Sequence, residues 1–289
     1  MAEEKKFPKW AKDLLVRLED HTQQAFRLLQ LSITGISGLA GLPEFLEALT
    51  DAAPPSDAVL PQEAQEGTDW LQNKAQLARS ELHSGFPLLS AQATISLWAD
   101  LENGLRTFLA AWLRHEDTAK TIDPIQKLKV SLGEYEAMDP DERCLYTIDR
   151  LELEMAPHNR PGIDRFEALF KAFGFETTLD ERLKRDLREL YSVRNLLVHR
   201  RGIADRRFIQ SCPWLGLSVG KQITMTPDAY FKYHHAVTVY LHEIIVRVSA
   251  RFGFSRSDLF TRPLGYKPRE ASLTSSNQLK AVAKNRSGP

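Results

Sequence analysis

The segment SAQATISLWADLENGLRTFLAAWLRH repeats apolar residues at the spacing of one helix face, and this pattern constrains the fold more than any other feature. The apolar positions follow at steps of three or four residues: Ile95, Trp98, Leu101, Leu105, Phe108 or Leu109, and Trp112. Such a stripe is stable only when it is buried against other elements. Ser90 suits the N-cap, and Gly104 lowers the stability of the helix from within. The segment therefore predicts a long core helix, with Trp98 and Trp112 in the core.

Other segments also predict helices. LDERLKRDLRELYSVRNLLVHRRG has Asp180 as a capping residue, and its stop is Gly202. Its apolar seam is predicted to comprise Leu183, Leu187, Leu190 or Tyr191, and Leu197 or Val198. The last predicted helix starts after Thr226 as N-cap, with Pro227 at its first position. LSVGKQITM predicts a small β-hairpin that turns at Gly220 and Lys221. The fold class is therefore all-α, with a β-hairpin inserted before the last helix.

The chain of 289 residues divides into four predicted regions. Residues 1–52 form an N-terminal helical extension, and residues 53–85 form an acidic, proline-rich linker with a short helix. Residues 86–252 form the main helical domain. Residues 253–289 form a basic tail, whose polar composition predicts disorder.

Composition favours a soluble intracellular chain. Cys144 and Cys212 lack the CxxC spacing of metal or redox motifs, and two distant cysteines fit a reducing compartment. The N-terminus has no apolar signal core. The most apolar stretch, LLQLSITGISGLAGL from Leu28, is too short and too rich in Gly and Ser to span a bilayer. We therefore expect a cytoplasmic protein with no membrane partner.

Charge is unevenly distributed, although 38 basic and 38 acidic residues cancel. From Glu44 to Asp69 the chain carries acids and neither Lys nor Arg, whereas bases dominate from Arg182 to Arg207. Blocks of this kind are usually solvated faces. The alternative for the basic block is a local surface that binds phosphate groups.

The stretch RNLLVHRRG, from Arg194 to Gly202, carries the candidate chemistry. Arg194 lies four residues after Leu190 and four before Val198, on the predicted buried seam. A buried guanidinium is costly unless it is paired. Arg194 is therefore either paired in the core, with Glu102 as a candidate, or directed into a cleft between helices or between subunits.

Asn195 and His199 are four residues apart and share a helix face. Arg194 and His199 are five apart, which is a rotation of about 140° on an ideal helix. The two can converge if the helix ends near His199. They can also converge if a second copy, related by a two-fold axis, contributes its own motif to one cleft.

The chain resembles the HEPN superfamily (higher eukaryotes and prokaryotes nucleotide-binding), whose ribonuclease members carry Arg, four to six residues, then His. The match is Arg194, Asn195 and His199, and LWADLENGLRTFL is similar to the family's early helix with its embedded acid, here Glu102. GIADRRFIQSCPWLGLSVGKQITM resembles an extension found after the motif in bacterial members. The resemblance spans about residues 86–252. One toxin branch has Tyr two residues after the His, where this chain has Arg201.

The resemblance implies a homodimeric HEPN-like bundle that cleaves RNA without metal or cofactor in defence or stress response, with an antitoxin or regulatory protein as a possible partner. The ribose 2′-hydroxyl would attack the adjacent phosphate while His199 moves the proton, a contribution of roughly 10²–10⁴-fold. Arg194 would stabilise the phosphate charge, and Asn195 would orient the histidine or hold the ribose. Four arginines would attract the RNA backbone: Arg200, Arg201, Arg206 and Arg207.

Other interpretations remain open. His199 can instead satisfy the last carbonyls of its helix, and His234, His235 and His242 fit core or surface positions. The alternative function is a non-catalytic HEPN-like module that binds nucleotide, RNA or protein and dimerises. GLSVGKQ lacks the spacing of a phosphate-binding loop, HExxH is absent, and no Cys/His spacing fits zinc.

Overall fold

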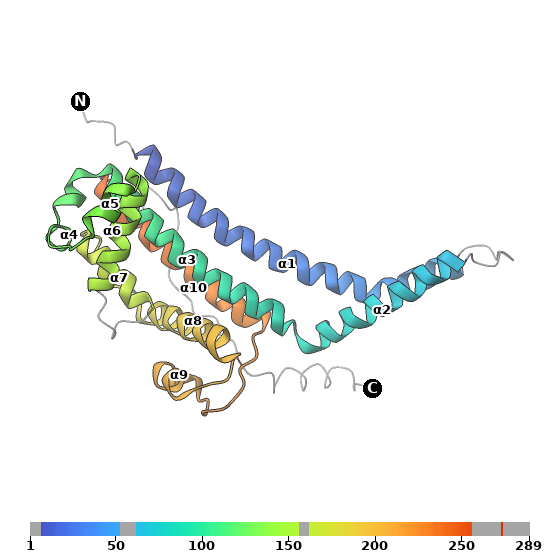
Figure 1. The fold of residues 1–289 in the computed structure, drawn as a ribbon. Coiled ribbons are helices and arrows are strands. Elements are labelled where there is room, and N and C mark those ends of the chain that lie inside the picture. Colours follow the sequence, from blue (N-terminus) through green and yellow to red (C-terminus); the bar gives the residue numbers. More distant parts are fainter. Residues whose placement is uncertain (1–6, 53–61, 156–161, 256–272, 274–289) are drawn as a thin grey trace.

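The computed structural model describes residues 7–52, 62–155, 162–255 and 273, and these form a helical bundle (Figure 1). The described α-helices are α1 (Lys9–Ala52), α2 (Gln62–Ser84), α3 (Pro87–His115), α4 (Asp123–Gln126), α5 (Leu132–Ala137), α6 (Pro140–Met155), α7 (Ile163–Ala172), α8 (Glu181–Arg200), α9 (Arg206–Ser211) and α10 (Pro227–Arg251). Two 3₁₀ turns are described as well, η1 (Asp117–Thr121) and η2 (Pro213–Leu215). The predicted all-α class is confirmed for these residues.

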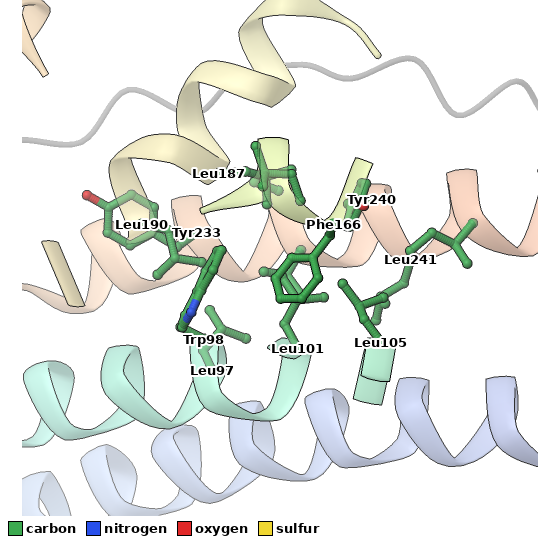
Figure 2. Packing of buried hydrophobic residues seen from close by; sticks show 14 of the residues in the cluster. Leu97, Trp98, Leu101, Leu105, Phe166, Leu187, Leu190, Tyr233, Tyr240 and Leu241 are labelled. Carbon is green, nitrogen blue, oxygen red and sulfur yellow. The ribbon is translucent and has the colours of Figure 1, made fainter. Parts of the chain in front are cut away.

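Helix α3 lies at the centre and packs against α1, α6, α8 and α10. Its predicted stripe is buried except for Ile95, which is partly buried, and Trp98, Leu101 and Leu105 are fully shielded from solvent. Figure 2 shows these side chains facing residues of the surrounding helices, among them Phe166 of α7 and Leu187 of α8. Trp112 is also buried. The predicted core role of both tryptophans is therefore confirmed.

The start of α3 differs from the prediction. Phe86, with φ 55°, occupies the N-cap, and Pro87 begins the helix. Ser90 is therefore buried inside the first turn rather than at the cap. Proline suits this start because its φ is already helical and it has no N–H to leave unpaired.

The N-terminal helix shares the core of the bundle. Leu15, Leu18 and Leu29 of α1 belong to the same buried cluster as the stripe of α3. A Cβ atom at position 104 would lie 2.1 Å from Leu18 Cδ1, so Gly104 allows the two helices to approach closely. Its cost to helix propensity is offset by this contact.

Helix α2 projects from the bundle alongside the end of α1 (Figure 1). It has 23 residues, longer than the short helix expected there, while the linker at 53–61 lies outside the described residues. Pro43 lies inside α1 and cannot donate a backbone hydrogen bond. Nearby, Arg79 of α2 donates from Nε to the Ala40 carbonyl at 3.0 Å and pairs with Glu44. These contacts fasten α2 to α1.

One described helix contains a window long and apolar enough to cross a membrane by length and composition alone. That helix covers Lys9–Asp51, and it includes an 18-residue stretch of mean hydropathy 1.3, of which 11% is buried. This stretch of 18 residues is longer than LLQLSITGISGLAGL, the 15-residue apolar segment from Leu28. In this structure α1 packs against α3 and α10.

The predicted β-hairpin at 217–225 is not formed. A turn occurs, with Lys221 N donating to Ser218 O at 3.2 Å, but the residues after it pair elsewhere. Ile203 and Gln222 form an isolated antiparallel bridge, and Ala204 N donates to Lys221 O at 2.8 Å. The backbone groups that a hairpin would use are thus satisfied by the loop after α8.

Most of the predicted disordered tail, at 256–272 and 274–289, lies outside the described residues. Leu273 is described and is buried in the core cluster. Its carbonyl accepts a hydrogen bond from Thr224 N at 2.9 Å.

The buried stripe of α3 predicts a large stability difference between matched leucine variants. Leu101→Ala should lower the free energy of unfolding by about 2–5 kcal/mol, because it leaves a cavity in a fully packed core. Leu153→Ala, at a position on α6 that is 69% exposed, should change it by less than about 0.5 kcal/mol. Urea denaturation followed by circular dichroism measures both, and equal losses would contradict the central position of α3.

Candidate functional site

Helix α8 presents the candidate motif, and both of its ends are well defined. Asp180 caps it, accepting from Arg182 N at 2.8 Å and Leu183 N at 3.1 Å, as predicted. At the other end Arg201 and Gly202 have φ values of 52° and 79°. Gly202 N donates to Leu196 O at 3.1 Å, and a Cβ atom on Gly202 would lie 2.7 Å from Gln222 Nε2. The chain therefore requires glycine here to leave α8 and enter α9.

A cleft of about 540 Å³ lies between the second half of α8 and α9. Asn195 and His199 of the candidate motif line it, together with two of the predicted RNA-binding residues, Arg200 and Arg207. The other lining residues were not identified from the sequence: Tyr191, Ser192, Leu196, Asp205, Phe208 and Ser211. The cleft therefore joins an imidazole, an amide and two guanidinium groups.

Arg194 does not line this cleft. Its Nη1 donates to Asn195 Oδ1 at 2.9 Å, while its Nε is buried without a hydrogen-bond partner among the described residues. The predicted seam is also shifted: Val198 is 44% exposed, and Val193 and Leu196 are buried instead. Arg194 therefore lies half-buried at the edge of the seam, beside the residue that lines the cleft.

Helix α8 ends close to His199, as the first route to convergence requires, but of Arg194 and His199 only the histidine lines the cleft. Helix α8 continues to Arg200, so His199 stays in its last turn. Five helical residues separate the two side chains by about 140° around the axis. Within one copy Arg194 thus stays outside the cleft that His199 lines, and convergence through a second copy remains a prediction.

Glu102 lies apart from the motif and is tied to other arginines. It accepts from Arg106 Nη2 at 3.0 Å and pairs with Arg165 of α7. Glu152 of α6 accepts from Arg106 Nε at 2.7 Å, so these charges join α3, α6 and α7. No ion pair between Glu102 and Arg194 occurs in the described part of the chain, and the structure gives Glu102 a packing role.

The remaining predicted arginines are exposed. Arg201 and Arg206 are open to solvent, but neither lines the cleft. Arg200 Nε lies 3.6 Å from Asp205 Oδ2, and Asp205 also caps α9 by accepting from Phe208 N at 2.8 Å. Asp205 is the one acidic residue among those that line the cleft. Because Arg200 and Arg207 outnumber this single carboxylate, the cleft favours an anionic ligand.

A buried charge cluster behind the cleft was not predicted. Lys232 of α10 donates to Glu189 Oε1 at 2.6 Å and lies 3.2 Å from Asp186 Oδ1, and all three are almost completely buried. Tyr233 also donates to Glu189 Oε1, at 2.9 Å. The signal in the sequence was Lys232, a charged residue between two aromatic residues of the apolar closing helix.

Cys212 and the histidines of α10 offer little for catalysis. Burial raises the pKa of the Cys212 thiol to about 11, so it stays protonated near neutral pH. His234 is buried and stacks on Phe26, with ring centroids 4.5 Å apart, which fits the predicted core role. His242 Nε2 lies 3.6 Å from Glu19 Oε1. Across the described ranges, no group of three or more His, Cys, Asp or Glu residues is placed to hold a metal ion.

Comparisons with protein-family models, with curated proteins and with solved structures found no match to this chain.

The buried cluster predicts unequal effects of two lysine substitutions. Lys232→Ala should lower the free energy of unfolding by about 3–5 kcal/mol, because it removes the buried cation that pairs with Glu189 and Asp186. Lys184→Ala removes a lysine of α8 that lies 3.3 Å from Asp164 Oδ1 at a more exposed position, and should cost less than about 1 kcal/mol. Chemical denaturation at neutral pH measures both, and similar losses would contradict a cluster that depends on Lys232.

Proposed function

We propose that this protein is a metal-independent endoribonuclease of HEPN type. The observation that carries the proposal is the cleft between α8 and α9, in which Asn195 and His199 lie with Arg200 and Arg207. An imidazole can both accept and donate a proton, which suits proton transfer. Guanidinium groups suit the phosphate groups of a nucleic acid backbone. RNA supplies both a phosphate and, in its 2′-hydroxyl, an internal nucleophile.

The reaction proposed is an internal transfer at one phosphate. The ribose 2′-oxygen forms a bond to phosphorus while the bond from phosphorus to the 5′-oxygen breaks. His199 takes the proton of the 2′-hydroxyl and, once protonated, gives that proton to the leaving 5′-oxygen. The products are a 2′,3′-cyclic phosphate and a free 5′-hydroxyl. DNA lacks the nucleophile and should remain uncut.

Arg194 enters this proposal through a second copy of the chain. Within one copy it does not line the cleft, and it donates a hydrogen bond to Asn195, which does. Two motifs facing each other across a two-fold axis would add an arginine from each copy to the cleft of the other. There the guanidinium would stabilise the charge that builds up on the phosphate oxygens.

A non-catalytic binding module is the second candidate. Arg194 lies outside the cleft, and a single copy therefore presents Asn195 and His199 without the arginine of the motif. The same cleft could hold a nucleotide or an RNA backbone with Arg200 and Arg207 and cut nothing. Binding that depends on Arg207 but is unaffected by the loss of His199 would favour this candidate.

Loss of the histidine should abolish cleavage. Purified protein with EDTA should cut labelled RNA to cyclic-phosphate ends, and His199→Ala should slow cutting by about 10²–10⁴-fold, because proton transfer is lost. The readout is gel analysis with assignment of the end groups. His83→Ala, at an exposed position of α2, is the matched control and should cut as the wild type does. No cutting of any RNA by the wild type would refute the nuclease.

A shared cleft predicts complementation between two inactive variants. Arg194→Ala and His199→Ala should each be inactive alone, whereas a mixture refolded together should regain activity, because one mixed cleft holds an intact arginine and an intact histidine from different copies. Sedimentation should give twice the chain mass of 32.8 kDa for the wild type and for both variants. A strict monomer, or mixed dimers without activity, would contradict the two-copy arrangement.

A further inference from the structure

Trp214 is an exposed aromatic residue that is fixed by the buried cluster. It lies in η2, directly after α9, and is 36% exposed. Its Nε1 donates to Glu189 Oε2 at 2.6 Å. The other oxygen of Glu189 accepts from Lys232 and Tyr233, and Glu189 itself is 1% exposed. A carboxylate held by three donors thus anchors an indole ring at the surface.

A cationic group accompanies the ring. The Arg185 guanidinium lies over Trp214, with its central carbon 5.3 Å from the ring centroid. Arg185 is itself exposed, and no ion pair to it is seen within the described ranges. A partly exposed aromatic ring with a guanidinium over it, next to a cleft lined by arginines, suits a single-stranded nucleic acid: a base stacks on the ring and a phosphate pairs with the cation.

Trp214 and the cleft lie along one face of α8. Arg185, Glu189, Ser192 and Leu196 follow at steps of three or four residues, and the last two line the cleft. From Glu189 to Asn195 the helix rises by about 9 Å. Ser211, three residues before Trp214, lines the cleft from the other side. A strand bound in the cleft therefore passes close to the ring as it leaves.

We infer that Trp214 and Arg185 form a stacking subsite for an unpaired nucleobase next to the cleft between α8 and α9. This inference rests on the proposed function and gives it a substrate class, single-stranded RNA. A duplex keeps its bases stacked inside the helix and cannot offer one to the indole. The buried cluster of Lys232, Glu189 and Tyr233 acts as a positioning device, because it holds the ring before any ligand arrives.

The test compares two substitutions that remove the same hydrogen bond. Trp214→Leu and Trp214→Phe both lose the donor to Glu189, but only Trp214→Phe keeps an aromatic face. Binding of a fluorescently labelled single-stranded RNA is measured by anisotropy at fixed salt, with His199→Ala as the background so that nothing is cut. Trp214→Leu should bind about 5- to 150-fold more weakly than the background protein, and Trp214→Phe should retain most of the affinity.

Controls separate the subsite from general effects. Trp70→Leu removes a tryptophan of α2 that is 60% exposed and should leave binding unchanged. Thermal unfolding shows whether Trp214→Leu and Trp214→Phe lose stability equally. Binding of a blunt RNA duplex should be the same for both Trp214 variants. A series of single-stranded RNAs, each lacking the base at a different nucleotide, locates the base that stacks. Loss of one particular base should weaken binding to the background protein, and the same loss should not change binding to Trp214→Leu.

The outcomes distinguish a failure of the stacking subsite from a failure of the proposed function. If the wild type cuts RNA while Trp214→Leu binds single strands as tightly as Trp214→Phe, the subsite is refuted and the nuclease stands. If both variants weaken equally, the effect comes from the lost hydrogen bond, and stacking is refuted. If the wild-type protein neither binds nor cuts RNA, the proposed function fails and the subsite fails with it.

Discussion

Helix α3 is buried against four other helices, α1, α6, α8 and α10, and this burial determines where the remaining elements lie. Its buried stripe, which includes Trp98, Leu101 and Leu105, belongs to one apolar cluster with residues of the neighbouring helices. Because interiors are as dense as organic crystals, such a helix fixes the positions of its neighbours closely. The orientation of α8, and hence of the candidate motif, follows from this packing.

Helix α8 has two roles on two faces. One face packs on α3 and α10 through Leu183, Leu187 and Leu190. The other carries Asn195 and His199 toward the cleft with α9. Between them lies Glu189, whose bonds to Lys232 and Trp214 connect the interior of the bundle to the surface beside the cleft. A proposed site supported in this way needs little reordering when a ligand binds, which favours affinity.

Two charge clusters pair buried or half-buried side chains between helices of the described bundle. Glu102 and Glu152 meet Arg106 and Arg165 between α3, α6 and α7, and Lys232 meets Glu189 and Asp186 between α8 and α10. Each cluster includes pairs between helices more than 40 residues apart, such as Arg106 with Glu152 and Lys232 with Glu189. A buried charge without its partner is strongly destabilising, so these clusters select one arrangement of helices over others. Glu102 pairs with Arg106 and Arg165 rather than with Arg194, for which the sequence made it a candidate partner. Spacing along the chain does not reveal which helix lies opposite.

The sequence by itself determined the helices, their caps at Asp180 and Thr226, and the buried stripe of α3, because helical periodicity and capping are local properties. It also brought Asn195 and His199 to one helix face, which needs only the spacing of four residues. Only the tertiary structure decided that Arg194 lies outside the cleft, that the chain after Gly220 pairs with the loop after α8 rather than forming a hairpin, and that Lys232 reaches Glu189. These features depend on which segments meet in space, and that is set by packing between distant parts of the chain, which no local pattern encodes.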